Sequence, residues 1–159
     1  VPRAGWLRVG VERAESVAAH SWGVAWLVLA LCPRGVDRGR ALAIATIHDL
    51  AEVVVGDITP HDGVDPAAKS AAEEQAMAGM VAPLHHAGEL NALWREYEDG
   101  STPEGRFVKA CDKLDMALMA AIYAEDQGAE TREFVDSALA RLSEPELRAL
   151  ARGTEHEET

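Results

Sequence analysis

Apolar residues recur at helical spacing in two long segments near the start of this chain. Residues 16–32 and residues 38–55 both carry them three and four positions apart, which is the spacing of one face of a helix. Ser16 precedes the first apolar run and Asp37 precedes the second, and both are preferred N-cap residues. Gly56 follows the second segment, in the position that commonly ends a helix. The pattern therefore predicts one helix in each segment.

Five more helices are predicted from the same period and its boundary signals. Thr102 followed by Pro103 is typical of a helix start. Residues 57–66 are rich in Asp, Gly and Pro and are expected to form a loop. No segment of the sequence alternates with the period of a strand. The predicted helices cover residues 67–84, 87–98, 104–127 and 131–142, and a short one follows Ser143.

The pattern as a whole predicts an all-α fold, a compact bundle of about six to seven helices in a single domain over residues 1–159. Residues 1–14 show no helical period and are expected to form an extended or turn-rich arm that is part of the functional site. Residues 153–159 are polar and are expected to fray. Apolar residues make up 48% of the chain, which is enough to bury a core.

The net charge of −12 argues against a general nucleic-acid-binding protein, because such proteins draw their affinity from Lys and Arg on phosphates. A small anionic substrate remains compatible, since a bound cation can supply local positive charge. No signal peptide is visible, and the longest apolar run, residues 22–31, is too short to span a bilayer. We therefore expect a soluble, cytoplasmic protein that does not act on membranes. Cys32 and Cys111 are expected to be reduced and buried.

The adjacent residues His48 and Asp49 lie inside an otherwise apolar predicted helix. A buried carboxylate needs a compensating partner, because burying an unpaired polar group costs about 2–7 kcal/mol and an ion costs more. A salt bridge is one such partner and a metal cation is another. Glu52 lies one helical turn further on, where it could act on a water beside that cation.

Two further polar residues interrupt apolar segments of other predicted helices. His20 precedes the apolar run of the first helix, and Asp112 lies in the long helix that starts after Thr102. A lone inward His is more often a hydrogen-bonded core residue, but three helices that each send such a residue inward can build a metal site. The mixed nitrogen and oxygen donors favour Mn, Co, Fe, Ni or Zn over Mg.

The order of these residues resembles that of the HD-domain superfamily of metal-dependent phosphohydrolases, and most closely its 5′-deoxynucleotidase branch. The similarity covers residues 5–120. It depends on the motifs R-x-E-S-V-x-x-H, H-D-x-x-E-x-x-x-G-D and F-V-K-x-x-D-K. The resemblance implies that Glu52 adjoins the attacking water and that Glu52 and Asp57 are catalytic. It also implies four metal ligands, which are His20, His48, Asp49 and Asp112.

The resemblance further implies that Asp57 contacts the sugar and helps to select a deoxy sugar, that Thr59 in the same loop contacts the substrate, and that Trp6 packs at the sugar. Bacterial enzymes of this branch carry a phosphate-binding arginine directly before that tryptophan, where this chain has Gly5. The phosphate partner is therefore left open among Arg3, Arg8, Arg13 and Lys113.

These features lead us to expect a phosphomonoesterase that hydrolyses (deoxy)nucleoside 5′-monophosphates with one divalent metal ion and acts as a homodimer. Three alternatives stay open: an HD-fold binding module without turnover, a hydrolase of a different small phosphate ester, and an oxidative HD enzyme with two irons. The last needs additional His ligands one turn apart, whereas His85 and His86 are adjacent. Trp22 and Trp26 are expected in the core, and Asp115 is expected to face solvent or pair with Lys109 or Arg106.

Overall fold

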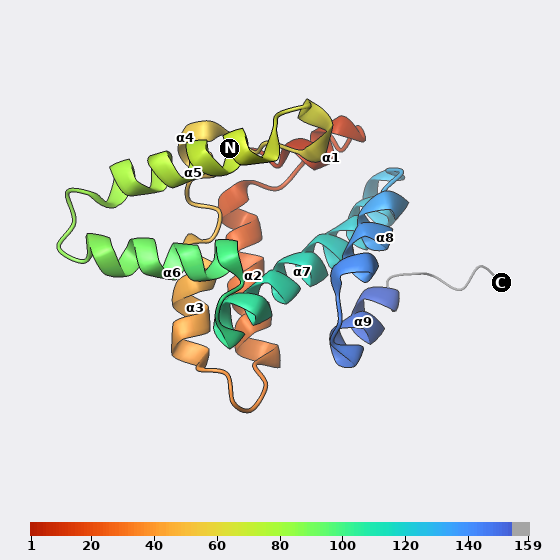
Figure 1. Cartoon of the computed structure of the whole chain (residues 1–159). Helices are drawn as coiled ribbons and strands as arrows, with labels where there is room; N and C mark the ends of the chain where they lie inside the picture. Colours follow the sequence, from red (N-terminus) through yellow and green to blue (C-terminus); the bar gives the residue numbers. More distant parts are fainter. Residues whose placement is uncertain (154–159) are drawn as a thin grey trace.

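The computed structural model describes residues 1–153, which form nine α-helices and one short 3₁₀ helix (Figure 1). The all-α prediction is confirmed over these residues, whose one β-type pairing is an isolated bridge between Pro2 and Ser16. Most of the tail expected to fray, residues 154–159, lies outside the described residues. The helices are α1 (Ala4–Arg8), α2 (Val17–Leu31), α3 (Arg38–Ile47), α4 (Glu52–Val55), α5 (Pro66–Val81), α6 (Ala87–Asp99), α7 (Pro103–Gln127), α8 (Arg132–Arg141) and α9 (Pro145–Arg152), with η1 (Pro60–Asp62) between α4 and α5.

Local capping sets the ends of the longer helices, as the sequence predicts. The side chains of Ser16, Asp37 and Thr102 each accept a hydrogen bond from the backbone N–H three residues further on, at the starts of α2, α3 and α7. These bonds satisfy N–H groups that have no partner within the helix. Gly128 ends α7 in the left-handed conformation, with φ of 63°, which glycine adopts without steric cost.

The prediction of a non-helical N-terminal arm is wrong over residues 4–8, which form α1. The fold of the arm is set by Trp6, whose side chain is 1% exposed and packs against Tyr123 and Phe134. One large apolar anchor in a five-residue helix produces no period that the sequence could reveal. Tertiary packing forms this helix, because a helix this short is unstable alone.

The predicted helix over residues 38–55 is divided between α3 and α4 by a turn that contains His48 and Asp49. In this turn the N–H of Leu50 bonds the carbonyl of Ile47 at 3.0 Å, and the N–H of Glu52 bonds the carbonyl of Asp49 at 3.1 Å. Such bonds to the third preceding residue tighten the backbone relative to an α-helix. The division of this helix and the formation of α1 raise the helix count from the predicted six or seven to nine.

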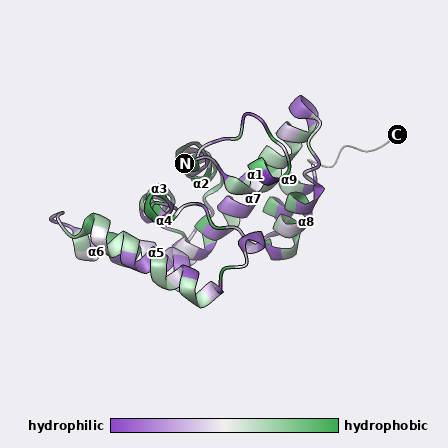
Figure 2. Cartoon of the chain, turned by 90° about the horizontal axis from the view of Figure 1, so that it is seen from above, coloured by the Kyte–Doolittle hydropathy of each residue, from purple (hydrophilic) through white to green (hydrophobic). Residues whose placement is uncertain are grey.

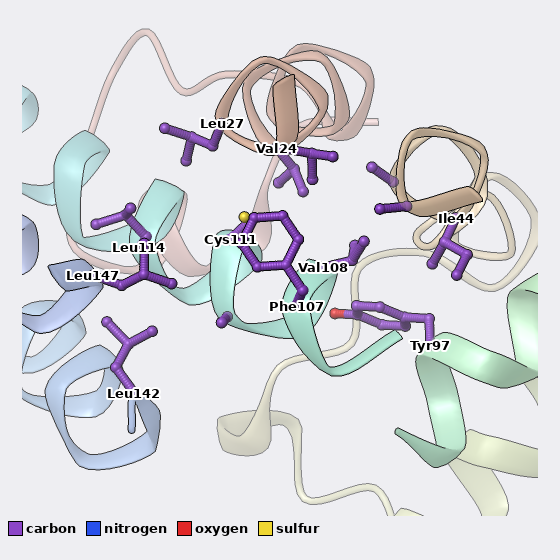
Figure 3. Close-up of a cluster of buried hydrophobic side chains, with 14 of the residues drawn as sticks. Val24, Leu27, Ile44, Tyr97, Phe107, Val108, Cys111, Leu114, Leu142 and Leu147 are labelled. Carbon is purple, nitrogen blue, oxygen red and sulfur yellow. The ribbon is translucent and has the colours of Figure 1, made fainter. Parts of the chain in front are cut away.

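The long helix α7 lies at the centre of the molecule and contacts α2, α3, α6, α8 and α9 (Figure 1). Its buried side chains meet those of α2, α3 and α6 on one side and those of the last two helices on the other (Figure 3). Val108, Cys111 and Leu114 are completely buried in this cluster. Because α7 crosses the whole core, a polar residue on its inner face is within reach of α2 and of the turn after α3.

The apolar residues of α2 are not all buried, which contradicts the expectation for two of them. Trp22 is 73% exposed and Trp26 is 56% exposed. Cys32, at the end of the same helix, is partly exposed rather than buried, whereas Cys111 is buried, and both are free thiols.

Unlike the largely apolar α2, the helices α5 and α6 carry hydrophilic and hydrophobic residues in alternation along their length (Figure 2). Within residues 1–153, no helix combines the length and apolar character needed to cross a membrane.

Candidate metal centre and its pocket

Four polar side chains from three parts of the fold converge beside the core. His20 comes from α2, His48 and Asp49 come from the turn after α3, and Asp112 comes from α7. His20 Nε2 lies 3.1 Å from Asp112 Oδ1 and 3.5 Å from Asp49 Oδ2, and His48 Nε2 lies 3.3 Å from Asp49 Oδ2. One ligand atom each from His20, His48 and Asp49 lie within 4.8 Å of one another. Ligand atoms at these distances from one another can all contact one metal ion. Asp112 belongs to the group because its Oδ1 atom lies close to His20 Nε2.

Both imidazole rings present an Nε2 atom without a hydrogen-bond partner toward these carboxylates. His48 Nδ1 lies 2.8 Å from the carbonyl oxygen of Ala45. A carbonyl oxygen only accepts, so Nδ1 carries the hydrogen and Nε2 presents a lone pair. His20 Nδ1 lies 2.7 Å from a carboxylate oxygen of Asp115. In the neutral His20 ring, Nδ1 therefore also carries the hydrogen and Nε2 the lone pair. Two buried nitrogen lone pairs that face carboxylates fit a divalent cation as their common partner.

Asp115 and a glycine determine how the His20 ring is held. Asp115 is 7% exposed, and its Oδ2 atom lies 2.7 Å from His20 Nδ1, so the expectation that it faces solvent or pairs with Lys109 or Arg106 is wrong. Its position requires a glycine on α2, because a Cβ atom at Gly23 would lie 2.4 Å from Asp115 Oδ1. Burial lowers the pKa of His20, but Asp112 and Asp115 raise it, to about 9 overall. The carboxylates around His20 thus favour a positive charge at its Nε2 side, and a divalent cation bound there would supply it in place of the proton.

Each candidate carboxylate ligand is also held by a neighbour. Asp112 Oδ2 accepts hydrogen bonds from the Tyr97 hydroxyl at 2.9 Å and from Lys113 Nζ at 2.7 Å. Asp49 Oδ2 accepts one from the Arg3 guanidinium at 3.2 Å. Burial raises the pKa of Asp112, but Lys113 and His20 together hold it well below its ordinary value. Asp112 is therefore a carboxylate, the form that binds metal.

Glu52, the first residue of α4, lies beside this cluster without entering it. Its side chain is 7% exposed, and its Oε2 atom is buried with no hydrogen-bond partner. Burial, and then the charges of Asp49 and Asp57, raise the pKa of Glu52 to about 8. A carboxyl group with its pKa near neutrality and a free oxygen is suited to accept and return a proton.

Asp57 connects the N-terminal arm to this region. Its Oδ2 atom accepts a hydrogen bond from the backbone N–H of Ala4 at 2.7 Å and lies 4.0 Å from Arg3 Nε. The carboxylate thereby holds the start of α1, and with it the guanidinium of Arg3, against the cluster. The arm thus lies against the cluster, and it does so as a helix.

A cavity of about 260 Å³ opens at the cluster. It is lined by residues from the arm, from the segment between α3 and α5, and from α5, α6 and α7. His20 does not line the cavity and is completely buried. The residues that line the cavity and carry a charge or a hydrogen-bonding group are Arg3, His48, Asp49, Glu52, Asp57, Lys69, Glu73, Trp94, Tyr97, Glu98, Lys109, Asp112 and Lys113.

Four residues expected to contact the substrate do not line this cavity. Trp6 is buried in the apolar cluster with Phe134, and its Nε1 donates to Glu15 Oε1 at 3.0 Å, so its ring is not available to a sugar. Arg8 pairs with Glu133 on the outer surface. Arg13 is exposed. The side chain of Thr59 is bonded to Asp62 at the start of η1.

Several residues of the cavity were missed by reasoning from sequence. Tyr97 and Trp94 read as core residues of α6, and Lys69 reads as a solvated residue of α5. Lys109 could have been predicted from the sequence to reach the site. It lies three residues before Asp112 on the same helix, at a spacing that puts both on one face.

The family described as HD domain matches residues 1–152 of this chain. Human 5′-deoxynucleotidase HDDC2 is 35% identical over 151 residues, covering 92% of this chain and 74% of that protein. The crystal structure of the PH0347 protein from Pyrococcus horikoshii superposes with a TM-score of 0.76 at 36% identity, covering 96% of this chain and 91% of that one. A structure titled "Predicted metal-dependent phosphohydrolase" from Magnetospirillum magnetotacticum superposes with a TM-score of 0.70 at 32% identity, covering 90% and 76%.

Proposed function

This chain belongs to the HD domain family, and from that premise we propose that it is a metal-dependent 5′-deoxynucleotidase that hydrolyses deoxynucleoside 5′-monophosphates to nucleoside and phosphate. The observation that carries the proposal is the pair of buried imidazole Nε2 atoms, of His20 and His48, that face carboxylates and have no hydrogen-bond partner. The activity named for the relatives supports the same reaction.

His20, His48, Asp49 and Asp112 hold the divalent cation in this proposal. Their two nitrogen and two carboxylate donors favour Mn, Co, Fe, Ni or Zn over Mg, which prefers oxygen ligands. When bound, such a cation polarises a phosphoryl oxygen and lowers the pKa of a water molecule. Asp115 and the carbonyl of Ala45 keep the two rings in the tautomer that ligation requires.

Glu52 accepts the proton of the attacking water in this reaction. The water oxygen forms a bond to phosphorus while the bond from phosphorus to the 5′-oxygen breaks, and the proton held by Glu52 is then available to that oxygen. The free Oε2 atom and the raised pKa of Glu52 support this role. No Ser or Cys nucleophile takes part, because neither residue type is among the residues that line the cavity.

Arg3 and Lys113 neutralise the other phosphoryl oxygens, since of the four cations proposed from the sequence they are the two that line the cavity. Arg8 and Arg13 are therefore not retained. Asp57 lies in the same wall as Arg3 and is retained as the contact with the sugar.

A phosphate-release assay with ribo- and deoxynucleoside 5′-monophosphates, run with Mn, Co, Ni, Zn and Mg, tests this proposal. We expect turnover with deoxynucleotides, and a fall of at least about 100-fold for Glu52→Gln with metal content unchanged, as is typical for removal of a general base. Glu146→Gln on the exposed side of α9 is the matched control and should have wild-type activity. Metal binding without turnover of any monophosphate would contradict the proposal and indicate a ligand-binding module.

We also propose that the protein is a homodimer that associates through the outer face of α2. Trp22, Trp26 and Leu29 lie on this face and are 73%, 56% and 46% exposed, and an apolar patch of this kind is typical of an interaction surface. Residues 17–31 include no charged side chain. In a chain with net charge −12, this face is where two copies can meet without placing like charges against each other.

A further inference from the structure

A second cavity, of about 410 Å³, lies between α7 and the connection from α8 to α9. It shares Tyr97, Lys109 and Lys113 with the wall of the first cavity. Its charge is opposite in character. Carboxylates outnumber cations in the first cavity, whereas in this basic cavity a single carboxylate, Glu144, faces four cations, which are Arg106, Lys109, Lys113 and Arg141.

The helical period of α7 and the end of α8 bring these four cations together. Arg106, Lys109 and Lys113 are separated by three and four residues, so they project from one face of α7. Arg141 occupies the last turn of α8 and approaches the same face across the cavity. The residues come from two helices, so their sequence positions alone do not predict the cluster.

Most of this positive charge is not neutralised by the protein. Arg106 donates to the carbonyl of Gly100 at 3.0 Å, and Lys109 donates to the carbonyl of Glu98 at 2.8 Å. Carbonyl groups carry no net charge. Among the described residues, Arg106, Lys109 and Arg141 form no ion pair, and only Lys113 of the four contacts a carboxylate, that of Asp112. Groups of like charge that gather in one cavity with few opposite charges repel each other, so an anion would stabilise this arrangement.

We propose that the basic cavity binds a phosphate group, separate from the phosphate that is hydrolysed at the candidate metal centre. A guanidinium group matches the geometry of phosphate oxygens through paired hydrogen bonds, and Arg106 and Arg141 supply two such groups. The hydroxyl of Ser143 adds a neutral donor at the same cavity. This binding depends on the geometry of the basic cavity alone and does not require the proposed reaction.

The phosphate in the basic cavity has two possible sources, and the shared wall points to the first of them. Lys109 and Lys113 line both cavities, so orthophosphate released beside Asp112 would meet the basic cavity on its way out. A phosphate group of a second nucleotide has the same chemistry and is the other source. The two sources differ in whether a nucleoside adds to the affinity.

NMR titration of the ¹⁵N-labelled full chain, as purified, with sodium phosphate tests the proposal, with sodium chloride at equal ionic strength as the blank. We expect the backbone amide signals of Arg141 and Ser143 to move in a saturable way. Arg141→Gln and Arg106→Gln should each weaken this binding at least about tenfold, because each removes a charged donor. Arg34→Gln, in the loop between α2 and α3, removes one charge outside the cavity and should bind phosphate as the wild type does.

Titration with a nucleoside 5′-diphosphate distinguishes the two sources. Tighter binding than orthophosphate at the same amide signals, lost in Arg141→Gln, would assign the cavity to a second nucleotide, and equal binding would assign it to orthophosphate. Both results support a phosphate site. Amide signals of residues 141–144 that do not respond to phosphate, or an affinity within twofold of wild type in both arginine variants, would overturn the proposal. Arg141 is exposed at a helix end, so its replacement leaves the fold available for this comparison.

Discussion

At the scale of single residues, the chemistry of this protein depends on how one atom of each side chain is held while another is left free. His20 uses Nδ1 to bind Asp115, and His48 uses Nδ1 to bind a backbone carbonyl. Each arrangement leaves Nε2 directed at Asp49. Glu52 likewise keeps one carboxylate oxygen without a partner. These free atoms, rather than the residue types themselves, suit the cluster to binding a metal ion and transferring a proton.

Asp115→Asn tests this view of His20. The amide no longer stabilises the hydrogen on Nδ1 as a carboxylate does, so we expect affinity for a divalent cation to fall about 10–100-fold, as is typical when the partner of a ligating His is lost. Equilibrium dialysis with metal analysis measures this change, and the rise in Tm on adding the cation should shrink in parallel. Asp126→Asn at the exposed end of α7 is the control. Unchanged metal affinity in Asp115→Asn would remove Asp115 from the site.

At the scale of helices, the junction of α6 and α7 determines where Asp112 can lie. A Cβ atom at Gly105 would lie 2.1 Å from the backbone oxygen of Glu96, so the two helices approach closely only because this residue is glycine. Glu96 also joins α6 to α3, because Arg40 Nε donates to its carboxylate at 3.0 Å, and the Thr102 hydroxyl donates to the same oxygen at 2.9 Å. One residue thus connects three helices around the site.

Gly105→Ala should lower the free energy of unfolding by about 1–3 kcal/mol or more, because backbone atoms must move to admit the methyl group. Urea unfolding followed by circular dichroism measures the change. Gly79→Ala is the matched control within α5, where a Cβ atom would meet nothing within 4 Å. There the same substitution should stabilise by up to about 1 kcal/mol through helix propensity. Equal effects of the two substitutions would contradict the close approach of α6 and α7.

The ion pair between Arg40 of α3 and Glu96 of α6 makes stability depend on pH. Hydrogen bonding by Arg40 and Thr102 lowers the pKa of Glu96 below its ordinary value of 4.5, so the folded state favours the ionised carboxylate. The resulting stability is present above pH 4.5 and is lost as the pH falls through the lowered pKa. Glu96→Gln should therefore be less stable than wild type at pH 7, with the gap narrowing as the pH falls below 4.5. A gap in unfolding free energy that is constant across this range would rule out the titration of Glu96 as its cause.

At the scale of the whole molecule, charge and apolar surface are segregated. The first cavity collects carboxylates, the basic cavity collects cations, and the outer face of α2 has no charge. Each surface therefore favours a different class of partner: a divalent cation, an anion, and a second copy of the chain. Because these surfaces are separate, a net charge of −12 is compatible with the proposed binding of an anionic substrate and with the proposed self-association.

The proposed dimer predicts a mass in solution of twice the chain mass of 17.1 kDa. Size-exclusion chromatography with light scattering measures it. Replacing Trp22 and Trp26 together by Glu should give a monomer, because each copy would then bring charges to the interface. Leu84→Glu is the control, since Leu84 is 51% exposed at the corner between α5 and α6. A wild-type chain that is monomeric at micromolar concentration would contradict the proposal.

The sequence by itself determined the features that depend on neighbours a few positions away. The caps at Ser16, Asp37 and Thr102, the helix end at Gly56 and the helical periods are set by hydrogen bonds and spacing within one or two turns. The motifs were also sufficient to predict the family and to select the four residues that converge at the candidate metal centre.

Only the tertiary structure decided what depends on residues far apart in the chain. It divided one predicted helix at His48, buried Trp6, left Trp22 exposed, and brought Asp115 to His20 across 95 positions. It also placed Arg3, which is 46 positions from Asp49 in the sequence, in the wall of the cavity beside Asp49. The physical reason is that burial and pairing follow from which surfaces meet in space, and a local period cannot tell an apolar face that meets the core from one that meets solvent.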